Sequence, residues 1–95
     1  MKSEGKIEII ELQKVLDLLA APVLLESFLQ KRGAAMLVDA ERVQRLGAQC
    51  LQILLSAKKA WEVEGFSFGL SNPSTAFTDA LGLMGVSVED LTYHA

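Results

Sequence analysis

The start of the chain mixes isoleucine and leucine with charged residues at short spacing. Residues 6–12 read KIEIIEL, where β-branched side chains dominate and alternate imperfectly with glutamates. This composition favours a β-strand. After Gln13 and Lys14, residues 15–18 predict a second short strand that forms a hairpin with the first. A helix over residues 9–19 is the competing interpretation, because the apolar spacing there is ambiguous.

The following apolar positions have helical spacing. Residues 20–22 read Ala-Ala-Pro, and a proline in the first turn loses no hydrogen bond and already has the φ of a helix. The helix is predicted to run to Gly33, a residue type that commonly follows a helix end. Its apolar face is formed by Leu24, Leu25, Phe28 and Leu29.

Residues 34–38 form an uninterrupted apolar run of strand length, which is typical of an interior strand. Asp39 ends this strand, and a polar loop then carries Val43 and Leu46 inward. Residues 49–61 predict a helix whose apolar side chains cover more than half of its circumference, so it should be the most buried helix of the chain.

The last third of the chain predicts one more strand and one more helix. Residues 66–70 alternate with period two, as in a strand. Residues 71–73, Ser-Asn-Pro, predict a helix cap followed by proline in the first turn. Gly85 ends this helix, and residues 86–95 form a mostly polar tail that packs as a short turn or frays.

The predicted order is therefore β-β-α-β-α-β-α. Two strand–helix–strand units imply right-handed crossovers and parallel pairing of the later strands. The hairpin at the start would make the four-stranded sheet mixed. We expect an α/β fold in which residues 1–95 form a single domain, with the helices packed mainly on one face of the sheet.

Composition and charge narrow the class of protein. The chain has 95 residues, 51% of them hydrophobic, and a formal net charge of -3. The negative charge argues against nucleic-acid binding, which usually requires a basic stripe. One cysteine fits a reducing compartment, and no apolar run reaches the length of a signal peptide core or of a membrane span. We expect a cytoplasmic protein with no membrane insertion, either a monomer or a weak dimer.

The residues that could support chemistry are few. His94 is the only histidine and lies next to the C-terminus, so a catalytic triad is not expected. Cys50 falls on an apolar helix face and is interpreted as a small buried side chain, although a helix N-terminus can also activate a thiol. No cysteine–histidine spacing fits zinc. We expect no catalytic residue, no cofactor and no metal.

Four segments of the chain are similar to the STAS domain family, the fold of bacterial anti-sigma factor antagonists. These segments are residues 12–22, 36–39, 46–55 and 70–86, and they occur in the order of the family. In STAS antagonists the turn before the second helix carries an aspartate followed by a serine or threonine that a partner kinase phosphorylates. The resemblance implies a STAS fold and a role in regulatory protein–protein interaction.

This resemblance draws attention to residues 43–55, where a predicted strand ends and a helix begins, because ligands and partners of open α/β sheets are usually met there. Aligning Leu51 with the family leucine places Gly47 at the aspartate and Ala48 at the phospho-acceptor, so Ala48 cannot be phosphorylated. The partner-binding residues implied by this alignment are Arg45, Gly47, Ala48, Gln49 and Gln52. The alternative is that Gly47 only permits a tight turn and Arg45 is only solvated.

The functional hypothesis is a non-enzymatic interaction module of bacterial signalling. Its partner would be an anti-sigma factor or histidine-kinase-like protein, or a chemotaxis component. The first alternative is a STAS subunit of a lipid-transport ABC complex that binds the ATPase. The second is an enzyme or small-ligand binder, for example with a nucleotide at the strand ends.

Overall fold

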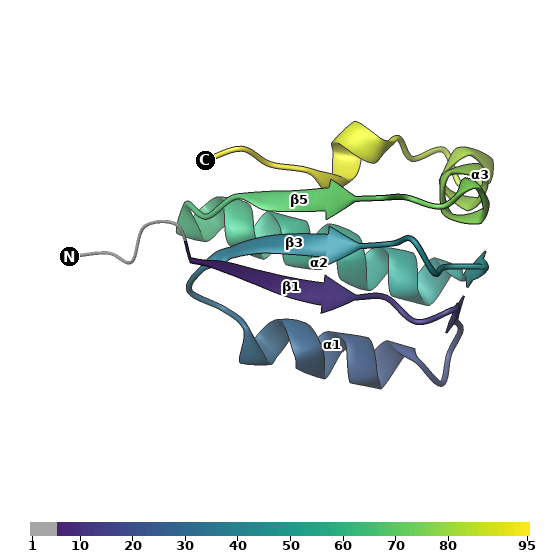
Figure 1. Cartoon of the computed structure of the whole chain (residues 1–95), viewed down its shortest axis with the longest axis horizontal. Helices are drawn as coiled ribbons and strands as arrows, with labels where there is room; N and C mark the ends of the chain where they lie inside the picture. Colours follow the sequence, from purple (N-terminus) through teal and green to yellow (C-terminus); the bar gives the residue numbers. More distant parts are fainter. Residues whose placement is uncertain (1–5) are drawn as a thin grey trace.

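The computed structural model describes residues 6–95, whose centre is a parallel sheet of three strands (Figure 1). The strands are β1 (Ile7–Glu11), β3 (Ala35–Asp39) and β5 (Phe68–Ser71), in the order β1-β3-β5. The helix α1 (Ala21–Gln30) lies between β1 and β3 along the chain, and α2 (Ala48–Glu64) lies between β3 and β5. The predicted parallel pairing of the later strands is therefore confirmed.

The predicted hairpin and the mixed four-stranded sheet are wrong. The strand β2 (Val15–Leu16) pairs in parallel with β4 (Arg45–Leu46) and forms a separate two-stranded sheet. The chain does not reverse after β1, because the N–H of Leu12 still donates to the carbonyl of Asp39 at 2.9 Å and extends the path beside β3. The Lys14 carbonyl then accepts from the N–H groups of Gln44 and Arg45, at 2.7 and 3.1 Å.

The predicted order also lacked one strand. The polar segment after β3 contains β4, so the observed order is β-β-α-β-β-α-β-α, followed by a 3₁₀ turn, η1 (Val88–Leu91). The predicted second strand was also too long. It stops at Leu16 because the carboxylate of Asp17 accepts from the N–H groups of Leu19 and Ala20 and turns the chain.

The hydrophobic core lies between the sheet and the helices α1 and α2. Three aromatic rings meet there, Phe28 from α1, Trp61 from α2 and Phe68 from β5, with centroids 5.7 to 6.0 Å apart. The indole N–H of Trp61 donates to the Ala34 carbonyl at 2.7 Å, so the polar atom of this buried side chain is satisfied. Each such aromatic pair contributes ~0.5–1.5 kcal/mol beyond the area it buries.

The helix α3 (Thr75–Leu83) begins later than residues 71–73 predicted. Ser71 still belongs to β5, because its carbonyl accepts from the N–H of Ala40 at 3.0 Å. Ser74 is the N-cap instead, and its hydroxyl accepts from the N–H of Phe77 at 3.0 Å.

The two outer strands of the sheet have different neighbours. Along the outer side of β5, the polar tail forms η1, and Tyr93 then makes an antiparallel bridge to Phe68. Along β1, β3 is the only strand partner among residues 6–95. Within residues 6–95, no helix covers the face of the sheet that is turned away from the core, as Figure 1 shows in front of β1 and β3.

Candidate functional site

The turn into α2 is held by a close contact between backbones. Gly47 is the N-cap of α2, and its N–H donates to the Leu16 carbonyl at 2.9 Å. A Cβ at this position would lie 3.2 Å from the same carbonyl oxygen, which is tighter than an ordinary contact. Glycine therefore allows β2 and the start of α2 to approach each other.

The first turn of α2 carries no side-chain cap. Gly47 has no side chain that could accept a hydrogen bond, and the turn contains no acidic residue. Ala48 and Gln49 are exposed, so the outward side of the turn faces solvent. The free N–H groups and the positive end of the helix dipole can together accept a carboxylate or another anion.

The remaining predicted partner-binding residues lie close to this turn. Arg45 is exposed on β4, two residues before Gly47, and its side chain forms no ion pair within residues 6–95. Gln49 and Gln52 are exposed on α2, where they line a shallow hollow together with Leu25 of α1. The structure thus places Ala48, Gln49 and Gln52 on one helix, with Arg45 on the strand that precedes it.

Two exposed leucines beside this turn were not predicted. Leu18 and Leu19 are 65% and 85% exposed, and they follow the turn made by Asp17. The thiol of Cys50 in α2 lies 3.4 Å from the Asp17 carbonyl, which places this segment against the first turn of α2. The sequence prediction placed Leu18 in a strand over residues 15–18 and gave Leu19 no role, whereas the tendency of aspartate to form turns could have revealed their exposure.

A groove between α1 and α2 extends from the same end of the molecule. It has a volume of about 110 Å³, and its apolar lining includes Leu25, Leu29 and Ala60. An ion pair between Arg32 and Glu64 lies at its far end. Both leucines were assigned to the apolar face of the predicted helix, but the observed core takes Leu24 and Phe28 from α1 and leaves Leu25 and Leu29 exposed.

Cys50 is fully buried, as the sequence predicted. Burial raises the pKa of its thiol, and the negative charge of Asp17 raises this pKa further. Because a thiolate is the reactive form, both effects make Cys50 a poor nucleophile. His94 is exposed beside the C-terminus and lies far from Cys50 in sequence.

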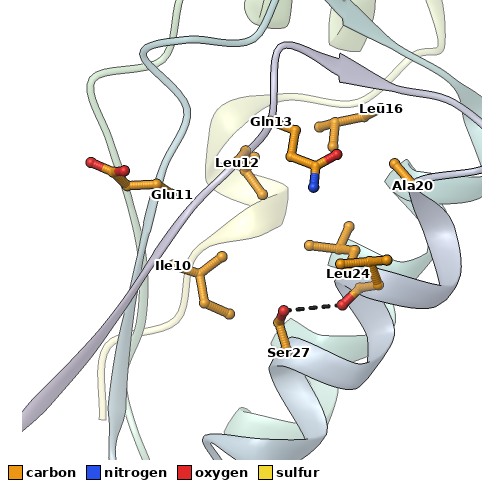
Figure 2. Close-up of a pocket in the computed structure, with 9 residues that line it drawn as sticks. Ile10, Glu11, Leu12, Gln13, Leu16, Ala20, Leu24 and Ser27 are labelled. Atoms are coloured by element: carbon orange, nitrogen blue, oxygen red, sulfur yellow. Dashed lines mark hydrogen bonds between the residues drawn. The ribbon is translucent and has the colours of Figure 1, made fainter.

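A small pocket lies between α1 and the segment that connects β1 to β2 (Figure 2). Its volume is about 40 Å³, and its lining is mainly apolar, with Ile10, Leu12 and Leu24 among the contributing residues. The hydroxyl of Ser27 donates to a carbonyl of its own helix, that of Val23, at 3.0 Å. Ligand sites are usually ~300–1,000 Å³, so this pocket is too small for a cofactor.

None of the helices within residues 6–95 combines the length and the hydrophobicity needed to cross a bilayer.

Comparisons with known proteins give the family and the fold. A protein-family model described as "Mlab, STAS domain" matches residues 2–92. Among solved structures, a sulfate transporter family protein from Wolinella succinogenes superposes with a TM-score of 0.74, over 96% of this chain and 75% of its own. The identity is 22%, so this likeness concerns the fold alone. No curated protein matches the chain.

Proposed function

Since the chain belongs to the STAS domain family, we propose that it is a regulatory protein–protein interaction module of bacterial signalling. Its docking surface is formed by Arg45, Gly47, Ala48, Gln49 and Gln52, together with Leu18 and Leu19. The partner is an anti-sigma factor, a histidine-kinase-like protein or a chemotaxis component. The family is one of interaction modules that are generally non-catalytic, and we propose the same for this chain.

The observation that carries this proposal is the uncapped start of α2 beside two exposed leucines. Protein interfaces combine an apolar centre with polar groups that fix the orientation of the partner. Here Leu18 and Leu19 supply apolar area, while the N–H groups of the first turn of α2 can receive a carboxylate or a carbonyl of the partner. The deeply buried Cys50 supplies no reactive group to this surface.

The surface works without a phosphorylation switch at the usual turn. Ala48 occupies the exposed first position of α2, and its methyl group has no oxygen to receive a phosphate. Ser74, which lies at the start of the next helix, uses its hydroxyl to accept from the N–H of Phe77 and to donate to the Val43 carbonyl. We therefore propose constitutive docking, regulated by the abundance or state of the partner.

Affinity purification from the native cell tests this proposal with three baits. The wild-type chain should recover a signalling protein, and Ala48→Glu should lose at least about nine-tenths of it, because the added carboxylate occupies the start of α2 and repels a carboxylate of the partner. Val63→Glu is the matched control, since it adds the same charge at an exposed position near the other end of α2. Equal recovery by Ala48→Glu and the control would place the interface elsewhere.

A second candidate function is a subunit of a lipid-transport ABC complex that contacts the ATPase. What favours it is membership of the STAS domain family, since other small STAS proteins fill this role against an ATPase. This candidate uses the same docking surface with a different partner. Recovery of an ATPase together with a permease by the wild-type bait, and their loss with Ala48→Glu, would select it over the signalling role.

A further inference from the structure

The face of the three-stranded sheet that is turned away from the helices has an ordered pattern of side chains. Strand register aligns them in three rows across the sheet, Ile7 with Ala35, then Ile9 with Leu37 and Gly69, then Glu11 with Asp39 and Ser71. Two rows are apolar, and Ile7 and Ile9 are each 56% exposed. Parallel sheets are normally covered on both faces, so an uncovered apolar face of this kind indicates a partner.

The third row is acidic and opens into a hollow at the carboxyl ends of the strands. This hollow, of about 190 Å³, is lined by Glu11, Asp39, Glu41 and Arg42. Arg42 is the only cation of the set, and its guanidinium lies 4.0 Å from the Glu11 carboxylate, with both side chains about two-thirds exposed. Three carboxylates therefore face one loosely held arginine, and the apolar rows end at a negatively charged hollow.

The dimensions of the face limit what can cover it. Three strands of about five residues present roughly 200 Å² to a partner, from a rise of ~3.3 Å per residue and a strand spacing of ~4.8 Å. A stable dimer buries about 800 Å² on each subunit, so this face alone is too small to hold a second copy of the chain, and a short helix on it would bind weakly. A strand added to the outer edge of β1 would leave both apolar rows exposed.

We propose that this face binds a basic amphipathic helix of a partner protein. A helix of about 11 residues spans the ~16 Å length of the strands. Its apolar stripe would cover Ile7, Ile9 and Leu37, and lysine or arginine at one end would enter the hollow beside Glu11 and Asp39. None of these residues belongs to the docking surface on α2, so the inference stands independently of the proposed function.

A designed peptide tests the chemistry of this face. The probe is a fluorescently labelled, stapled helical peptide of about 12 residues, with a leucine stripe and two lysines in its last turn. We expect binding by fluorescence anisotropy, with amide chemical shift changes centred on β1 and β3. Ile9→Thr should weaken binding at least about tenfold, whereas Val63→Thr, a matched change at an exposed position on α2, should not.

Reversing the charge of Glu11 distinguishes a loss of peptide recognition from a loss of folding. Glu11→Lys should weaken the lysine peptide about tenfold and strengthen a second peptide that carries two glutamates in place of the lysines, because like charges repel across an interface. Thermal unfolding of each variant checks the fold, and sedimentation velocity checks its oligomeric state. The proposal is overturned if the wild type does not bind, if shift changes centre on the groove between α1 and α2, or if the charge exchange has no effect. A dimer that Ile9→Thr dissociates would also overturn it, because the face would then belong to a second copy.

Discussion

The two helices that follow strands β4 and β5 begin in opposite ways. At the start of α3, the hydroxyl of Ser74 accepts from the N–H of Phe77 at 3.0 Å and donates to the Val43 carbonyl at 2.6 Å. At the start of α2, Gly47 offers no side chain, and its N–H contacts the backbone of β2. One helix start is closed by internal hydrogen bonds, and the other is left open on its outward side.

The capped start of α3 stabilises the fold, whereas the uncapped start of α2 is available to a partner. Ser74 joins α3 to the segment that leads into β4, since its N–H also donates to the Ala40 carbonyl at 3.2 Å. The start of α3 therefore holds the path of the chain toward α2. The start of α2 can then leave its N–H groups to solvent or to a partner, because backbone pairing between β2 and β4 already fixes its position.

Removing the closed cap should give the largest effect on stability. Ser74→Ala loses the hydrogen bond to Phe77 and leaves the carbonyl of Val43 without this donor, so we expect a loss of about 2 kcal/mol, at the upper end for an N-cap. Urea unfolding followed by circular dichroism measures it. Ser74→Thr keeps the hydroxyl and should retain most of the stability. A change below about 0.5 kcal/mol in Ser74→Ala would mean that this cap does not distinguish α3 from α2.

Substitutions at Gly47 separate steric contact from capping. Gly47→Ala places a Cβ 3.2 Å from the Leu16 carbonyl oxygen, and we expect a net loss of about 1 kcal/mol after the gain from a stiffer unfolded chain. Gly47→Ser adds the same Cβ together with a hydroxyl that can cap the first turn, so it should be more stable than Gly47→Ala. Equal stability of the two variants in urea unfolding would show that the first turn of α2 gains nothing from a cap.

A negative charge at the open start should stabilise the fold while it weakens docking. In Ala48→Glu the carboxylate interacts favourably with the N-terminal end of α2, and we expect a gain of about 0.3–1 kcal/mol that decreases with salt. Thermal unfolding at low and high salt measures this gain. Loss of partner recovery by a variant that is more stable than the wild type cannot be attributed to misfolding. A destabilised Ala48→Glu protein would contradict the open geometry of this turn.

The sequence predicted the three helices and the three strands of the central sheet, because each has an apolar period, an uninterrupted apolar run or, at β1, a predominance of β-branched residues. It missed β4 and gave β2 the wrong length and the wrong partner, and these two strands have two residues each. Strands this short show no measurable hydrophobic period. Their pairing depends on backbone hydrogen bonds, such as those to the Lys14 carbonyl, which the side chains do not predict. The start of α3 was misplaced for a related reason, since Ser71 and Ser74 are both good caps and only the pairing of β5 decides between them.

The candidate site was only partly visible in the sequence. The position of Gly47 and Ala48 at the start of a helix was predicted correctly, and the structure places both at the first turn of α2. The neighbouring Leu18 and Leu19 were missed because apolar residues are assigned to a core by default. Their exposure follows from the turn at Asp17, which competes with strand extension through hydrogen bonds of its side chain.

The side of the first turn of α2 that faces the protein should be closed to solvent, in contrast to its outward side. The titration and the alkylation of the Cys50 thiol measure whether solvent reaches it. Burial, and then the charge of Asp17, raise the pKa of this thiol above 9.0 in the folded protein. The unfolded chain therefore releases the proton at lower pH, so the contribution of Cys50 to stability is complete below the unfolded pKa and is lost as pH rises through it toward the folded pKa. Urea midpoints should fall more steeply above pH ~9 for the wild type than for Cys50→Ala, which lacks this titration and loses the buried sulfur at every pH. Iodoacetamide should also react with the folded protein far more slowly than with the unfolded chain. Equal alkylation rates of the folded and the unfolded protein would mean that the first turn of α2 opens on both sides. The difference between the starts of α2 and α3 would then come from local unfolding of α2 and not from capping.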